Sequence, residues 1–243
     1  MSIFFCNFGI MEVHELQFAH RRVCIYRRTD ASVPIVYSID YHENGRLLMD
    51  AFKQVGCEQY NLVTVSGLDW NQELSPWPAG TVVSKDDSFT GQAEPWLSLL
   101  TGDVVPQVER TLAVRPAWRC LAGYSMAGLF ALWAAHHTDL FSGIVSASGS
   151  MWYPGWMEYV QEHRLSPGVT AVYLSVGDKE STSRNAVLQT VGARTQAVAA
   201  AIERQAVRVM FEFNPGNHFK NPPLRVAKGV KWLTDMINHV DSK

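Results

Sequence analysis

One short stretch limits the possible folds of this chain more than any other. Residues 118–133 read WRCLAGYSMAGLFALW, an apolar half that predicts a strand followed by a half without breakers that predicts a helix. Ser125 falls between the two halves, with Gly123 two positions before it and Ala127 and Gly128 after it. Small residues let a strand and a helix pass close together around a strained turn. The stretch therefore predicts a strand–turn–helix unit that displays a serine hydroxyl.

This pattern is typical of a nucleophile elbow, whose usual form is G-x-S-x-G. Alanine, the next smallest residue, occupies the last place here, at position 127. An ordinary strand and helix joined by a Ser N-cap would produce the same short motif. The context favours the elbow, because acidic residues and a histidine follow later in the chain in the appropriate order. The helix N-terminus would then direct unpaired N–H groups at a developing oxyanion.

Strands and helices alternate along the chain from residue 34 onward. Apolar runs predict strands at 15–28 (as one strand or two), 34–40, 61–66, 118–124, 143–148, 170–177 and 207–213. Helices are predicted at 45–55, 95–112 (with a break or kink at Pro106), after Ser125, 183–205 and 222–239. Continuous apolar strands indicate burial on both faces. The sequence thus predicts a single α/β domain over residues 1–243, with a mostly parallel central sheet and helices on both faces.

Composition excludes several classes of partner. The chain is 47% hydrophobic and carries a net charge of −2, so no overall field attracts nucleic acid or an anionic membrane. No apolar run is long enough to span a bilayer, and the first ten residues lack the basic region of a signal peptide. Four scattered cysteines fit a reducing compartment, which predicts a cytoplasmic location. The basic residues that flank the apolar strand 23–26 are interpreted as protection of an edge strand: His20, Arg21, Arg22, Arg27 and Arg28.

Residues that follow the strands supply a catalytic constellation. In α/β folds the active site lies at the carboxyl ends of the strands. Asp178 and Glu180 follow the strand that ends at Gly177, and His218 follows the strand that ends at residue 213. With Ser125 as nucleophile they give the order Ser, acid, His of the α/β-hydrolases. The histidine would take the serine proton, and the acid would orient the imidazole.

Strand position alone does not choose between the two acids. Asp178 could bond the backbone locally, whereas the longer Glu180 could reach across the strand ends toward His218. Backbone N–H groups of Met126 and of Tyr41 or His42, with His42 preferred, are the expected oxyanion donors. No histidine cluster has a zinc-like spacing, so neither a metal nor another cofactor is predicted.

Two long irregular segments, 67–94 and 149–167, are rich in aromatic residues. Loops of this length inside a compact domain are often functional. The aromatic residues could anchor the loops, or they could wall an apolar cleft for substrate. The predicted substrate contacts are Trp70, Trp77, Trp152 and Tyr153.

The chain resembles the putative-esterase family of α/β-hydrolases, which includes esterase D-like, feruloyl esterase and enterochelin esterase-like enzymes. The matching segments extend from about residue 20 to the last helix: VYSID at 36–40, Trp70 with LSPWP at 74–78, GYSMAG at 123–128, LSVGDKE at 174–180 and GNH at 216–218. The resemblance implies a serine carboxylic-ester hydrolase and places the triad acid at Glu180. One departure is Tyr41, where relatives often have glycine after the aspartate.

Three functions fit these residues. The first is hydrolysis of a small-molecule ester through an acyl-enzyme on Ser125, with His218 as general base and Glu180 as orienting acid. The second is acyl transfer to an alcohol by the same triad. The third is a non-catalytic binding protein on a hydrolase fold, because a fold does not determine function. No sequence signal indicates an oligomeric state.

Overall fold

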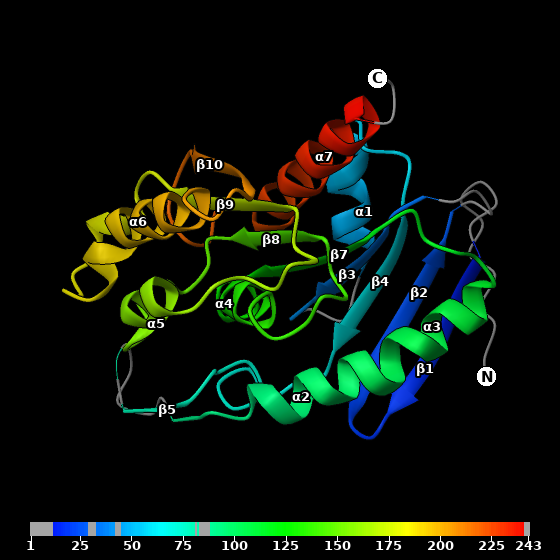
Figure 1. Cartoon of the computed structure of the whole chain (residues 1–243), viewed down its shortest axis with the longest axis horizontal. Helices are drawn as coiled ribbons and strands as arrows, with labels where there is room; N and C mark the ends of the chain where they lie inside the picture. The colour runs from blue at the N-terminus through cyan, green and yellow to red at the C-terminus, as the bar shows by residue number, and fades with distance from the viewer. Residues whose placement is uncertain (1–11, 29–32, 42–44, 81, 83–87, 241–243) are drawn as a thin grey trace.

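The computed structural model describes residues 12–28, 33–41, 45–80, 82 and 88–240, with the side chains of 237–240 left aside. These residues form one central sheet with helices on both of its faces (Figure 1). The α/β class that the sequence predicted is therefore confirmed.

The central sheet has eight described strands and is mostly parallel. Across the sheet the strands are β1 (Glu12–Phe18), β2 (Arg21–Arg27), β4 (Asn61–Ser66), β3 (Ile35–Ile39), β7 (Arg119–Tyr124), β8 (Gly143–Ala147), β9 (Ala171–Gly177) and β10 (Arg208–Asn214). β1 and β2 are antiparallel to their neighbours, and every pairing from β4 to β10 is parallel. The register places Tyr124 opposite Ala147 and Gly177 opposite Asn214, so the last residues of these strands lie at one edge.

Helices cover the two faces unequally. One face carries α1 (Gly45–Gln54) and α7 (Pro222–Val240), and the other carries α2 (Ala93–Leu99), α3 (Val105–Leu112), α4 (Met126–Ala134), α5 (Trp156–Glu162) and α6 (Val191–Glu203) (Figure 1). Side chains along β2 point alternately to the two faces of the sheet, so they contribute to both hydrophobic cores. Val23 and Ile25 pack with the larger helical layer, and Cys24 and Tyr26 pack with α1 and α7.

The first predicted strand is two strands, and the interpretation of its basic residues as edge protection is wrong. β1 forms the edge of the sheet, and β2 lies inside it between β1 and β4. Arg21 instead forms an ion pair with the buried Glu73, and its guanidinium lies 5.3 Å from the centre of the Trp96 ring. Arg21 therefore helps to hold the segment after β4 against the sheet, whereas Arg22 and Arg27 pair with Glu15 and Glu12 of β1.

Two helices differ from the prediction. Pro106 does not break its helix, because a π-helical segment, Leu100–Val104, precedes it and joins α2 to α3 without interruption. The predicted helix 183–205 begins only at Val191, after two short 3₁₀ turns at Glu180–Thr182 and Leu188–Thr190. The two irregular segments also contain regular elements: α5, and a small ladder between β5 (Pro78–Ala79) and β6 (Phe89–Thr90).

Within the described ranges, no helix is both long and apolar enough to cross a membrane. Cys24, Cys57 and Cys120 are buried, and burial raises the pKa of Cys57 above its ordinary value. These three cysteines act as small core side chains.

Candidate active site

Ser125 occupies a strained turn between β7 and α4. Its backbone has φ 59° and ψ −121°, a conformation that non-glycine residues rarely adopt. A Cβ atom at Gly123 would lie 2.2 Å from the carbonyl oxygen of Ala127, so only glycine fits where strand and helix cross. The Ser125 amide donates to the Ala147 carbonyl at 3.2 Å, which fixes the turn to the neighbouring strand. This is the geometry expected of the elbow.

The structure brings Ser125, His218 and Glu180 together in one line of hydrogen bonds. Nε2 of His218 lies 3.1 Å from Oγ of Ser125, and Nδ1 lies 2.7 Å from Oε2 of Glu180. Each residue comes from a separate strand end: the β7–α4 turn, the segment after β9 and the loop between β10 and α7. The distances allow His218 to receive the serine proton while Glu180 holds its other ring nitrogen.

Asp178 makes a different contact. Its Oδ1 accepts a hydrogen bond of 2.7 Å from the Gly216 amide, in the loop that carries His218. Two backbone bonds reinforce this link, from the Asp178 amide to the Asn214 carbonyl and from the Lys179 amide to the Gly216 carbonyl. Asp178 therefore joins the two loops through the backbone, as aspartates in turns often do.

Glu180 is held as a carboxylate in a buried position. Only 7% of the residue is exposed, and burial by itself would raise its pKa. Hydrogen bonds from the His218 ring, the Gly177 amide and the Ser148 hydroxyl outweigh burial, so the pKa of Glu180 lies below its ordinary value. Oε1 takes the bonds from Ser148 and Gly177, which leaves Oε2 to His218.

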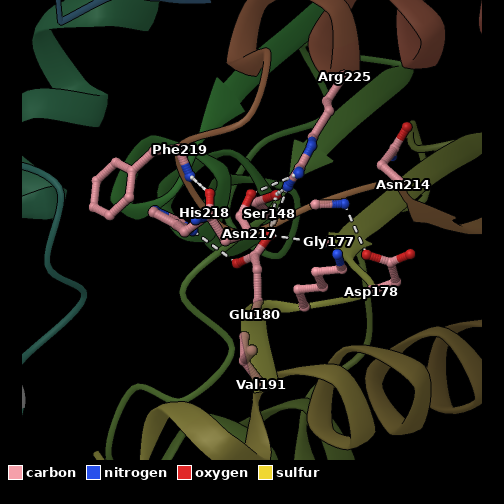
Figure 2. A network of polar contacts seen from close by, with 12 residues as sticks. Ser148, Gly177, Asp178, Glu180, Val191, Asn214, Asn217, His218, Phe219 and Arg225 are labelled. Atoms are coloured by element: carbon pink, nitrogen blue, oxygen red, sulfur yellow. Dashed lines mark hydrogen bonds and ion pairs between the residues drawn. The ribbon is translucent and has the colours of Figure 1, made fainter. Parts of the chain in front are cut away.

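Sequence reasoning missed three groups around this line, which are Tyr124, Ser148 and Arg225. Figure 2 shows the Arg225 side chain reaching toward Ser148 and Glu180. The Tyr124 hydroxyl donates to the backbone carbonyl of His218, and burial raises the pKa of Tyr124 to about 12, so it stays a neutral donor. The position of Arg225 offered a weak signal, because it lies in the first turn of the helix that follows the His218 loop.

Of the expected oxyanion donors, Met126 and the alternative second donor Tyr41 fall in the described part of the chain. Met126 is the first residue of α4, where a backbone N–H has no partner within the helix. Met126 also lines the cleft beside Ser125. His42 lies outside the described residues. Tyr41, the residue before it, is exposed and meets the Trp70 ring edge-on at 5.3 Å.

A cleft of about 460 Å³ opens at the serine. Ser125, Met126 and His218 line it together with aromatic and aliphatic side chains: Trp70, Phe89, Trp152, Leu188, Val191 and Phe219. Lys179 also lines the cleft. In the described part of the chain, no group of three histidine, cysteine or carboxylate residues could hold a metal ion.

Of the four predicted substrate contacts, Trp70 and Trp152 line this cleft, and Trp77 and Tyr153 are not among the described residues that line it. Trp77 packs against Trp156 and Tyr159, and its indole N–H donates to the Pro154 carbonyl at 2.9 Å. Tyr153 is fully buried and donates to the Trp77 carbonyl at 2.6 Å. These two residues tie the irregular segments to each other, because their polar atoms bond the opposite backbone.

Comparisons with known proteins agree with this fold. The model of a family described as "Putative esterase" matches residues 33–220. An uncharacterized protein, YbbA of Bacillus subtilis (strain 168), is 26% identical over 220 residues, which cover 86% of this chain and 88% of that protein.

Two solved structures have similar folds at 16% identity. An IroE-like serine hydrolase from Shewanella oneidensis superposes with a TM-score of 0.75, covering 93% of this chain and 80% of its own. The siderophore hydrolase EstB from Aspergillus nidulans gives a TM-score of 0.74, with coverage of 96% and 97%. The chain therefore belongs to the putative esterase family and has the α/β-hydrolase fold.

Proposed function

We propose that this protein hydrolyses a small-molecule carboxylic ester through an acyl-enzyme on Ser125. His218 acts as general base and acid, and Glu180 orients the imidazole and stabilises its charged form. The observation that carries the proposal is the continuous line from Ser125 Oγ through His218 to Glu180, with bonds of 3.1 and 2.7 Å, at the wall of an aromatic cleft.

The reaction has two halves. In the first, Oγ of Ser125 attacks the ester carbonyl while its proton passes to Nε2 of His218. The negative charge on the tetrahedral oxygen is stabilised by the N–H of Met126 and by a second donor, proposed to be the backbone of His42. The carbon–oxygen bond of the ester then breaks, and His218 returns the proton to the departing alcohol.

In the second half, a water molecule attacks the acyl group on Ser125 and gives its proton to His218. The bond between Ser125 Oγ and the acyl carbon then breaks, His218 returns the proton to Oγ, and the carboxylic acid leaves. An alcohol in place of water would give acyl transfer by the same steps. Product analysis with and without an acceptor alcohol separates these two outcomes.

The cleft favours an apolar or aryl substituent on the substrate. Trp70 and Trp152 line it, and aromatic walls bind flat apolar groups by contact area. Structural neighbours described as siderophore hydrolases and enterobactin esterases make aryl-bearing lactones sensible candidates. We therefore propose Trp70 and Trp152 as substrate contacts.

A substrate panel tests this function. Purified protein is assayed with p-nitrophenyl esters of graded chain length, aryl esters and siderophore-type lactones. We expect saturable hydrolysis, with kcat/KM higher for esters that carry an aryl or longer apolar group than for the acetate. No hydrolysis of any ester, together with no reaction with a fluorophosphonate, would favour a non-catalytic binding protein.

A further inference from the structure

Arg225 is a buried cation in contact with the predicted triad acid. It is 2% exposed and comes from the first turn of α7, on the face of the sheet opposite α4. Its Nη1 lies 2.6 Å from Oε1 of Glu180 and 2.7 Å from Oγ of Ser148. Burial of an arginine is costly unless its charge is paired and its N–H groups are bonded. Glu180 supplies the paired charge.

The other end of the same guanidinium holds the loop that carries the base. Nη2 donates to the carbonyl of Asn217 at 2.7 Å and approaches the carbonyl of Pro215 at 3.4 Å. Nη1 also lies 3.3 Å from the Tyr124 hydroxyl, which itself bonds the His218 carbonyl. The planar, forked guanidinium therefore bonds Glu180 through one nitrogen and the His218 loop through the other. A lysine ammonium cannot make both sets of bonds with the same geometry.

We infer that Arg225 is a positioning residue that keeps the Glu180–His218 pair in its reactive form, Glu180 charged and His218 neutral, to lower pH than the pair would otherwise reach. The inference rests on the proposed function, because it gives Glu180 and His218 their triad roles. Arg225 itself contacts neither the nucleophile nor the cleft among the described contacts.

The direction of the expected pH shift follows from the net charge of the Glu180–His218 pair. With Glu180 charged and His218 neutral, the pair has a net charge of −1. After the pair binds one more proton, its net charge is zero. A fixed positive charge beside Glu180 favours the form with −1 and so releases the proton at lower pH. Because the two groups are coupled, the activity profile reports this proton for the pair and not for either residue alone.

Other titratable groups around the pair are placed differently. Tyr124 from β7 is a neutral hydroxyl that accepts from Arg225, and Asp178 accepts from the Gly216 amide. Lys179 and Lys220, beside Glu180 and His218 in sequence, are exposed, so solvent screens their charges. On α7, Lys228 pairs with Glu212 and bonds Asn214. Among the described lysines and arginines, Arg225 is the one that forms an ion pair with Glu180.

The test compares three variants: Arg225→Gln removes the charge, Arg225→Lys keeps it without the fork, and Lys228→Met is the matched control. The control removes a cation from the same helix, one that contacts Glu212 and Asn214 at the end of β10 but not Glu180. Each is assayed for kcat/KM and for the rate of fluorophosphonate inactivation across acidic to alkaline pH, with melting temperature as a check on folding. Inactivation needs no knowledge of the substrate.

For Arg225→Gln we expect the acidic limb of both profiles to move up by about one pH unit, with roughly tenfold lower rates on that limb. The alkaline plateau should fall less. For Arg225→Lys the limb should stay in place while the plateau falls, because the charge remains and the bonds to the loop are lost. Lys228→Met should leave both the limb and the plateau close to those of the wild type.

A uniform loss of rate in Arg225→Gln without movement of the limb would overturn the inference and leave Arg225 a structural residue. If Arg225→Gln does not fold, an acidic limb that moves to higher pH in Arg225→Lys would also contradict the inference. Failure of the proposed function is distinguishable, because wild-type protein that neither hydrolyses esters nor reacts with the fluorophosphonate would remove the triad itself. Normal wild-type reactivity with unchanged variant profiles overturns only the role of Arg225.

Discussion

The strand-end loops and the two irregular segments hold their residues in different ways. Residues 178–180 and 214–218 are tied to each other by backbone hydrogen bonds and to the sheet by the ends of β9 and β10. The irregular segments are joined to each other by side chains, through ring contacts of Trp77 with Tyr153, Trp156 and Tyr159 and through the bonds of Trp77 and Tyr153 to the opposite backbone. The polar site is therefore fixed by sheet topology, whereas the aromatic walls are fixed by side-chain packing.

Residues at the strand ends and residues in the aromatic packing should therefore affect different properties of the protein. Changes at the strand ends should alter chemistry with modest loss of stability, unless they leave a buried charge unpaired. Changes in the aromatic packing should alter stability, except at the side chains that face the cleft. The predictions below test this division.

The largest effect is expected from Ser125→Ala. Loss of the nucleophile should lower kcat by roughly 10⁵- to 10⁶-fold while the oxyanion donors remain. Ser150→Ala is the matched control, since its hydroxyl lies 3.5 Å from that of Ser125 and has no role in the proposed mechanism. It should retain kcat within about tenfold of wild type. Steady-state hydrolysis measures both, and near-normal turnover in Ser125→Ala would remove the mechanism.

The second test separates the two acids. Glu180→Gln should lower kcat by about 10⁴-fold, because the amide cannot stabilise the imidazolium. It also leaves Arg225 without its paired charge, so unfolding should be measured beside activity. Asp178→Asn should stay within about tenfold of wild type, since an amide oxygen can still accept from the Gly216 amide. If instead the Asp178 variant loses the larger factor, the two roles are exchanged.

A smaller effect separates the two tryptophans. Trp152→Ala should change the ratio of kcat/KM for aryl and short alkyl esters by roughly tenfold, because Trp152 lines the cleft. Trp77→Ala should leave that ratio nearly unchanged. It should lower the free energy of unfolding by about 3 kcal/mol, because it removes the ring that packs against Trp156 and Tyr159. Kinetics and urea denaturation of both variants provide the measurement. Equal changes in selectivity would show that packing and substrate contact are not divided in this way.

The smallest effect concerns pH and stability in the aromatic region. Burial lowers the pKa of His136 from 6.5 to about 4. The unfolded chain therefore binds a proton there before the folded protein does, and stability is lost as pH falls from 6.5 toward 4. His136→Gln should lose less stability over that interval than wild type, as measured by urea denaturation at several pH values. Parallel losses would mean that His136 does not contribute.

Much of the polar site could be predicted from the sequence. Ser125 and His218 follow apolar runs that end at the same edge of a parallel sheet, and chain order assigned them their roles. The choice of Glu180 over Asp178 needed its greater reach and the family resemblance. Arg225 gave only a weak signal, because its contact with Glu180 depends on how α7 packs against β7, β8 and β9.

The fold was predicted best where local pattern and tertiary contact agree. The interior strands, buried on both faces, were correctly placed. The arginines that flank β2 resemble edge protection and so predict an edge strand, but β1 pairs with β2 and covers it. Trp77 and Tyr153 were predicted as substrate contacts because aromatic composition does not reveal which way a loop side chain faces. Their ring contacts and backbone bonds are long-range and have no local signal.

The most direct test of the central claim is to identify the residue that reacts with a fluorophosphonate. Native protein is treated with the probe, digested and analysed by peptide mass spectrometry, with Ser125→Ala and Ser150→Ala treated in parallel. We predict one adduct, on Ser125, in the wild type and in Ser150→Ala, and no adduct in Ser125→Ala. An adduct on another residue, or no adduct on native protein that has the wild-type melting temperature, would contradict it.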